Sequence, residues 1–291
     1  MDGPTKPESY EHIEVTPIAG TMGAEISGVD LAALDDATFD ELYQAWLRYQ
    51  VVVLRDQEIT PDQQLAFALR FGEIHFHPYM TGMDDHPEIL EIVKEANDDY
   101  TFGASWHTDQ MFNPQPAKAT MLYAKETPSV GGDTIFANMH DAYDALSDGM
   151  KAMLAEVKTW CVGDRFKRSG GSARKDRYAG NKKMASRVRD PGDLQTETAH
   201  PLFRTHPETG RMALYIGGHA QTLHGFDEAE VEPLLTFLRQ HSVRPEFTCR
   251  VDWQPGTITI WDNRSVQHYA VPDYTERRRM HRITIAGDTP Y

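Results

Sequence analysis

Two spacings of apolar residues alternate along this chain and predict a mixed α+β fold. A helix is predicted to follow Asp35 or Asp36, either of which can cap it, because apolar side chains then recur at positions i, i+3, i+4, i+7 and i+8. These apolar side chains are Phe39, Leu42, Tyr43, Trp46 and Leu47. The next apolar run, residues 51–54, is short and continuous, which is typical of a buried strand.

A second helix is predicted to begin at Pro61, since proline suits the first helical position and Thr60 can cap the helix. Gln63 would complete a capping box with Thr60. A third helix is predicted after Phe226. Further strands are predicted over residues 88–94, 119–124, 134–137 and 257–263.

Composition narrows the class of protein. The 291 residues suffice for one large domain or two small ones, and 40% of them are hydrophobic. A net charge of -15 predicts repulsion from nucleic acid and from anionic membranes over most of the surface. No apolar run approaches membrane-spanning length, and residues 1–14 are polar rather than a signal peptide. With only two cysteines as well, we expect a cytoplasmic protein.

The segment 105–109 (SWHTD) contains the first candidate chemistry, a His-x-Asp pair. The segment is predicted to be a strand that follows a loop, and His107 and Asp109 would then point to the same side of it. An imidazole and a carboxylate side by side form half of a metal site, and a second histidine would complete the set found in non-haem Fe(II) oxygenases. A lone His-x-Asp pair is common by chance, so the pattern depends on another histidine, for which His268 is the candidate after the strand 257–263.

The last predicted strand carries several basic residues. Strand parity puts Arg278, Met280 and Arg282 on one face and the residues between them on the other. A buried arginine without a partner is costly, so an inward-facing pair predicts anionic groups near the metal. The planar guanidinium suits carboxylates, because it can donate two parallel hydrogen bonds.

Two other basic features have competing interpretations. His75 and His77 alternate with apolar residues, and spacing alone favours hydrogen-bonded, structural histidines. Residues 164–190 are rich in Arg, Lys, Ser and Gly and nearly lack apolar side chains. This segment is either a solvated insertion or a mobile lid whose positive charge attracts or clamps an anionic ligand.

Four blocks of residues, in order and at matching approximate spacing, resemble the taurine dioxygenase family of Fe(II)/2-oxoglutarate-dependent oxygenases. The blocks are 106–109 (WHTD), 128–134 (PSVGGDT), 261–264 (WDNR) with 267–270 (QHYA), and 278–282 (RRMHR). The resemblance extends from about Ile13 to the C-terminus. It implies a double-stranded β-helix, or jelly-roll, core with flanking helices, in a single oxygenase domain over residues 1–291.

The resemblance also implies roles for individual residues. The iron ligands would be His107, Asp109 and His268. Thr134 and Arg278 would bind the distal carboxylate of the co-substrate 2-oxoglutarate.

Substrate residues are implied in the same way. His77 and Arg282 match positions that hold the anionic group of the substrate, which replaces the structural interpretation for His77 alone. Gly103 stands where the taurine enzymes carry an asparagine, which predicts a substrate longer or bulkier than taurine. Gln110 and Phe112 are further candidates for the pocket lining.

The implied reaction uses Fe(II), 2-oxoglutarate and O2 to hydroxylate a small anionic substrate, releasing succinate and CO2. The substrate would be a sulfonate, a sulfate ester or an aryloxyalkanoate, often with cleavage of a carbon–heteroatom bond. A homo-oligomer, dimer or tetramer, is expected by analogy. Two alternatives use the same residues: a zinc hydrolase with the His-x-Asp and His set, and a non-catalytic jelly-roll binding module in which His107 and Asp109 are only hydrogen-bonded.

Overall fold

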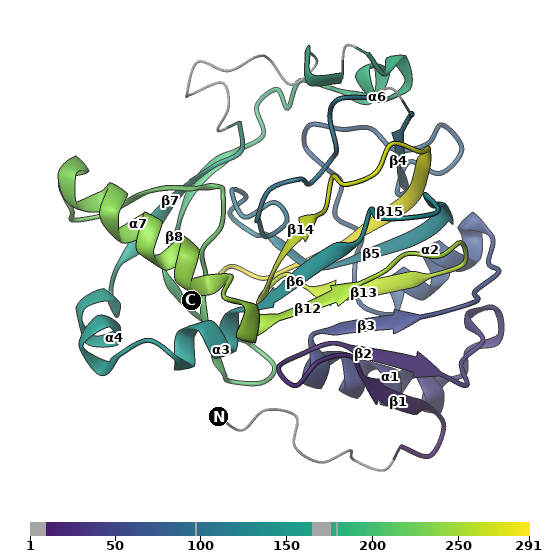
Figure 1. Ribbon diagram of the computed structural model, residues 1–291, viewed down its shortest axis with the longest axis horizontal. Helices are drawn as coiled ribbons and strands as arrows, with labels where there is room; N and C mark the ends of the chain where they lie inside the picture. Colours follow the sequence, from purple (N-terminus) through teal and green to yellow (C-terminus); the bar gives the residue numbers. More distant parts are fainter. Residues whose placement is uncertain (1–9, 97, 165–175, 179) are drawn as a thin grey trace.

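Two sheets of unequal size, both mainly antiparallel, face each other in this protein, and helices cover the outer face of the large sheet (Figure 1). The computed structural model describes residues 10–96, 98–164, 176–178 and 180–291. In order across the large sheet, the strands are β1 (Glu14–Pro17), β2 (Ala24–Ser27), β3 (Val51–Leu54), β13 (Ile258–Asp262), β5 (Ala117–Glu126), β15 (Arg278–Ala286) and β4 (Leu90–Lys94). The small sheet consists of β12 (Thr248–Val251), β6 (Thr134–Asn138) and β14 (Val266–Ala270).

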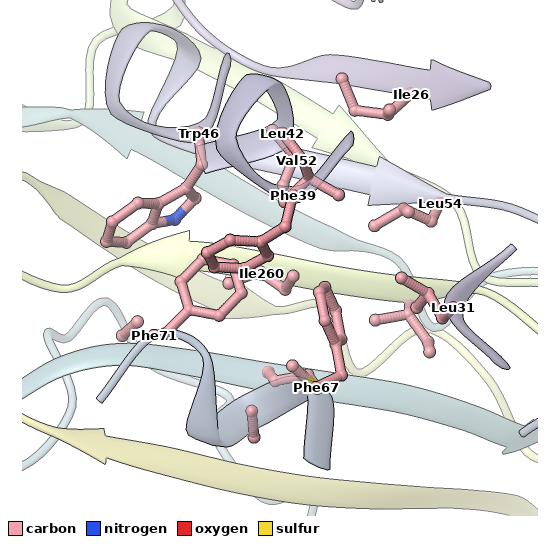
Figure 2. Packing of buried hydrophobic residues seen from close by; sticks show 14 of the residues in the cluster. Ile26, Leu31, Phe39, Leu42, Trp46, Val52, Leu54, Phe67, Phe71 and Ile260 are labelled. Carbon is pink, nitrogen blue, oxygen red and sulfur yellow. The ribbon is translucent and has the colours of Figure 1, made fainter. Parts of the chain in front are cut away.

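Helices α1 (Asp36–Tyr49) and α2 (Pro61–Leu69) pack on the outer face of the large sheet, as Figure 2 shows from close by. Both predicted caps are confirmed. The Asp35 side chain accepts a hydrogen bond from the backbone N–H of Thr38, and Thr60 and Gln63 form a reciprocal capping box. The capped ends fix where each helix begins, and therefore which residues face the sheet.

Aromatic rings fill the space between these helices and the large sheet. The ring of Phe71 lies edge-on to the rings of Phe39, Trp46 and Phe67, with centroids 5.3, 5.3 and 5.5 Å away. Such edge-to-face pairs are favourable beyond the area that they bury. This cluster supports the outer face of the strands whose inner face carries the site.

The inner face of the large sheet packs on the small sheet. Side chains alternate along the strands, so that Ile283 and Ile285 of β15 lie in the outer cluster while Met280 lies in the inner one. The predicted parity of Arg278, Met280 and Arg282 is therefore confirmed. Two facing, mainly antiparallel sheets with flanking helices agree with the predicted jelly-roll core and α+β class.

A third group of elements packs beyond the small sheet around its own hydrophobic cluster (Figure 1). It includes α3 (Met139–Asp144), α4 (Asp148–Leu154), α7 (Glu228–Ser242), a sheet of β11 (Ala220–Leu223), β7 (Lys158–Val162) and β8 (Glu197–Pro201), and the pair β9 (Phe203–Thr205) and β10 (Met212–Leu214). The remaining helices are the short η1 (Leu31–Ala33), η2 (Asp176–Tyr178), α6 (Lys182–Arg187) and η3 (Pro245–Phe247). Within the described ranges, no helix is both long enough and apolar enough to cross a bilayer.

The strand predicted over residues 105–109 is wrong. Only His107 makes a ladder contact there, an isolated bridge to His268. The hydroxyl of Thr108 donates instead to the carbonyl of Val266, and Gln110 adopts a left-handed φ of 54° that turns the chain. Tertiary contacts, rather than a continuous ladder, hold this segment.

The outer cluster gives a stability prediction. Replacing the fully buried Leu42 with alanine should lower the free energy of unfolding by about 3 kcal/mol, because it leaves a cavity between α1 and the large sheet. Urea denaturation followed by circular dichroism measures this change. The matched control is Leu69→Ala in α2, where the side chain is 52% exposed and the expected change is within about 0.5 kcal/mol. An equal loss of unfolding free energy in the two variants would contradict the buried position of Leu42 between α1 and the large sheet.

Candidate active site

Three buried side chains converge between the two sheets: His107, Asp109 and His268. One nitrogen or oxygen atom from each lies within 4.8 Å of the others. Nε2 of His107 is 3.6 Å from Oδ1 of Asp109, and Nε2 of His268 is 3.8 Å from Oδ2. Two imidazoles and one carboxylate, grouped in this way, match the donor set of non-haem Fe(II) sites.

The backbone brings the two histidines together. His107 and His268 exchange both of their backbone hydrogen bonds, at 3.1 and 2.9 Å, and their ring centroids are 4.2 Å apart. His268 lies inside β14, where it pairs with Phe136 of β6. The bridge therefore attaches the loop that carries His107 and Asp109 to the small sheet.

Hydrogen bonds and burial favour the metal-binding form of both imidazoles. Nδ1 of His107 is 2.6 Å from the carbonyl oxygen of Ser105. Because a carbonyl can only accept, this contact assigns the proton to Nδ1 and leaves a lone pair on Nε2. Burial, reinforced by the neighbouring His107, lowers the pKa of His268 well below its ordinary value. A neutral imidazole is the form that binds a metal.

The carboxylate of Asp109 is held from the large sheet. The hydroxyl of Thr120 on β5 donates to Oδ2 at 2.6 Å, and the side-chain amide of Asn263 donates to that hydroxyl at 2.9 Å. Arg282 forms an ion pair with Oδ1 at 2.9 Å. Burial, the largest single influence, would raise the pKa of Asp109, but Arg282, His268 and His107 together hold this pKa well below its usual value.

A cavity leads from these three residues to Arg278. Its walls include Thr134, Leu122 and Met280. Arg278 is only 6% exposed, and its Nε and Nη2 have no hydrogen-bond partner within the described chain. The described residues form no carboxylate ion pair with it either. A buried guanidinium at the end of a cavity, hydrogen-bonded to Tyr274 but with Nε and Nη2 unsatisfied, fits a carboxylate of a ligand that reaches the metal ligands with its other end.

Thr134 adds a hydroxyl to this end of the cavity. Its Oγ1 accepts a hydrogen bond from the indole N–H of Trp253 at 3.0 Å, which leaves the hydroxyl hydrogen to donate. The guanidinium of Arg278 lies 5.6 Å from the ring centroid of Trp253. The residues predicted to bind 2-oxoglutarate thus lie in one cavity, together with the predicted metal ligands.

A second cavity opens on the other side of His107 and Asp109. Four of the predicted substrate residues line it: His77, Gly103, Gln110 and Phe112. Arg282 lines the first cavity, where it pairs with Asp109, and also a further cavity that it shares with His77. The walls of the second cavity are largely aromatic: Tyr79, Tyr100, Phe102, Phe112 and His219.

The end of the basic segment 164–190 supports the loop that carries His77. Arg189 donates to the carbonyl oxygens of His77 and Pro78, at 2.7 and 3.0 Å. The backbone N–H of Arg189 donates to the carbonyl of Tyr79. Residues 165–175 and 179 lie outside the described residues, so the lid stays a prediction.

Several residues of the site were not identified individually from the sequence. Arg177, from the basic segment, lines the second cavity and pairs with Asp164 at 3.0 Å. Gly163 lines the same cavity, where an added Cβ would come within 2.6 Å of the Tyr79 hydroxyl. The hydrogen bond of Thr120 to Asp109 becomes apparent only once the order of the strands is known. The position of Thr120 in the predicted strand 119–124 indicated only which face its side chain shares.

Comparison with known proteins gives consistent matches over nearly the whole chain. Residues 14–284 match the family described as Taurine catabolism dioxygenase TauD, TfdA family. The chain is 36% identical over 289 residues to a (S)-phenoxypropionate/alpha-ketoglutarate-dioxygenase of Sphingobium herbicidovorans, covering 94% of this chain and 95% of that protein. It is also 36% identical to an alpha-ketoglutarate-dependent sulfate ester dioxygenase of Pseudomonas putida, over 98% of this chain and 93% of that protein.

The fold also matches solved structures over nearly the whole chain. The crystal structure of a taurine dioxygenase from Burkholderia xenovorans has a TM-score of 0.80 to this protein. The sequence identity in that match is 32%, and it covers 96% of this chain and 91% of that chain.

The hydrogen bond from Thr120 to Asp109 can be tested through metal affinity. Thr120→Val keeps the side-chain volume but removes the donor, so Fe(II) should bind about 10- to 100-fold more weakly in an anaerobic titration. The matched control is Thr259→Val on the neighbouring strand β13, because the buried Thr259 hydroxyl has no partner in the described chain. An unchanged affinity in Thr120→Val would contradict this role.

Proposed function

The chain belongs to the taurine catabolism dioxygenase TauD, TfdA family and is an alpha-ketoglutarate (2-oxoglutarate)-dependent dioxygenase, and we propose that it uses Fe(II) to hydroxylate a small aromatic anion. The observation that carries this proposal is the cavity that joins the buried His107, Asp109 and His268 to Arg278, whose guanidinium has no carboxylate partner among the described residues. Neither a zinc hydrolase nor a non-catalytic binding module would require this buried arginine.

This chain offers residues for both the iron and the co-substrate. His107, Asp109 and His268 would hold the iron, while Arg278 and Thr134 would bind the distal carboxylate of 2-oxoglutarate. When bound together with O2, iron and 2-oxoglutarate supply the oxidising chemistry, and succinate and CO2 are released.

The remaining residues of the site orient groups and exclude water. Thr120 and Asn263 keep the Asp109 carboxylate turned toward the two histidines. Arg282 balances the charge of Asp109 and lies near enough to attract a second anion. The aromatic walls of the second cavity shield the reacting carbon of the substrate from solvent.

The lining of the second cavity supports an aryloxyalkanoate more than a short sulfonate. Its aromatic side chains, such as Tyr79 and Phe112 with ring centroids 5.7 Å apart, suit a flat apolar ring. Gly103 adds no side chain to the cavity wall, and Gly163 lets Tyr79 and Phe112 pack directly against the backbone. Hydroxylation of the carbon next to the ether oxygen would then release a phenol and an oxo acid.

The carboxylate of such a substrate would bind between His77 and Arg282. Nδ1 of His77 accepts from the backbone N–H of Tyr79 at 3.0 Å, which assigns the proton of the neutral ring to Nε2. That N–H is a donor suited to an anion. Sulfate esters and sulfonates present the same anionic end and remain the comparison substrates.

The assembly of the protein stays a prediction. We propose a single oxygenase domain over residues 1–291 that forms a homo-oligomer, dimer or tetramer. Sedimentation equilibrium would distinguish these assemblies from a monomer.

The co-substrate site gives a direct spectroscopic prediction. Under anaerobic conditions, Fe(II) and 2-oxoglutarate should give a visible charge-transfer band in the wild-type protein. Arg278→Gln should weaken 2-oxoglutarate binding about 100-fold, because it removes the buried cation, and Asp109→Ala should abolish the band by loss of iron. The control Arg279→Gln lies on the opposite face of β15, where it pairs with Glu126, and should leave the affinity unchanged. Absence of the band while iron is bound to wild-type protein would reject the proposal.

The size of the substrate cavity gives a second prediction. In Gly163→Ala the new methyl group would meet Tyr79 and Phe112 at less than 3 Å, so kcat/KM for aryloxy acids should fall about tenfold. A short alkyl sulfonate should be affected less. The control is Gly149→Ala in α4, where nothing lies within 4 Å of the added carbon. Similar losses for the two substrate types would contradict an aryl-binding cavity.

A further inference from the structure

Lys94 at the end of β4 lies directly opposite Arg278 in the large sheet. The two residues are register partners of the antiparallel pair β15–β4. Side chains of directly opposite residues share one face of the sheet, so Lys94 points to the inner side together with Arg278. Like charges in this arrangement repel each other unless something compensates them.

Both cations are buried against the same aromatic ring. Lys94 is 9% exposed and Arg278 is 6% exposed. Nζ of Lys94 lies 4.9 Å from the ring centroid of Tyr274, and the guanidinium of Arg278 lies 6.0 Å from it. In the parts of the chain that the structure describes, neither cation forms an ion pair with a carboxylate. Contact with this ring, and the hydrogen bond of Arg278 to the Tyr274 side chain, compensate two neighbouring buried charges less well than a carboxylate would.

A third cavity, of about 300 Å³, lies beside this pair and contains both side chains in its lining. Arg278 lines the inner cavity as well, so it separates the outer space from the metal ligands. Three aspartates also line the outer cavity: Asp98, Asp99 and Asp176. Asp98 already accepts hydrogen bonds from the backbone of Glu95 and the side chain of Asn181.

We infer that Lys94 is a second cation for the distal carboxylate of 2-oxoglutarate, acting beside Arg278. The inference rests on the proposed function, since it requires 2-oxoglutarate in the inner cavity. The bound carboxylate then supplies the negative charge that the two side chains lack. Lys94 also makes the outer cavity attractive to an approaching dianion, because it extends the positive charge of Arg278 outward.

The test compares two 2-oxo acids in anaerobic Fe(II) titrations of wild-type protein and Lys94→Met. Methionine keeps an unbranched stem against Tyr274 but removes the charge. The affinity for 2-oxoglutarate should fall about tenfold. The affinity for 2-oxopentanoate, which lacks the distal carboxylate, should change less than twofold. Lys94→Arg should keep the affinity for 2-oxoglutarate within about threefold of wild type.

The matched control is Lys125→Met. Lys125 lies on β5 of the same sheet and also stacks on a tyrosine, with Nζ 4.1 Å from the centroid of Tyr123, on the outer face. The Lys125→Met variant should bind both 2-oxo acids with the affinity of the wild-type protein.

Two results would overturn the inference. Equal weakening of both acids in Lys94→Met would assign Lys94 a structural role only. Unchanged affinity for both would mean that the aspartates of the outer cavity already neutralise it. If Lys94→Met does not fold, Lys94→Gln replaces it in the same comparison. Failure of wild-type protein with bound iron to bind 2-oxoglutarate would instead reject the proposed function.

Discussion

The backbone bridge between His107 and His268 is the constraint on which the site depends. It joins a loop without regular structure to the small sheet through two hydrogen bonds. Asp109 follows two residues later, so the same bridge brings its carboxylate within reach of Thr120 on the large sheet. The three candidate metal ligands are thereby held from both sheets. Separation of the sheets would disperse the ligands together with the core that lies between them.

Charge is distributed unevenly between the surface and the interior of this protein. The whole chain carries a net charge of -15, yet the inner face of the large sheet presents Lys94, Arg278 and Arg282. Asp109 is the one carboxylate paired with these three cations among the described residues. Such an interior favours anionic ligands through desolvated positive charge, while the acidic surface disfavours polyanions such as nucleic acid. The interior therefore favours anions, and the surface separately disfavours large polyanions.

Local pattern in the sequence predicted the elements whose contacts are local. The caps of α1 and α2, and the parity of Arg278, Met280 and Arg282, follow from spacing alone. The 105–109 strand was wrong because a single long-range bridge, rather than propensity, holds His107. Thr120, Gly163 and Lys94 acquire their neighbours only through the strand order and the loop packing, which a one-dimensional pattern does not contain. The motif blocks supplied the candidate ligands through resemblance, and the folded chain added the groups that orient them.

The two halves of the site are built from different kinds of structure. Arg278, Thr134 and His268 stand on strands in the middle of the core, whereas His77 and Phe112 stand on loops, with His77 held in part by Arg189. Loops tolerate substitution and insertion far better than packed strands do. Substitutions in the loop of His77 can therefore change the lining of the second cavity while Arg278, Thr134 and His268 keep their positions, whereas Phe112 shares its loop with His107 and Asp109. This separation makes the protein readily evolvable toward new substrates, and it gives directed evolution a defined set of positions to vary.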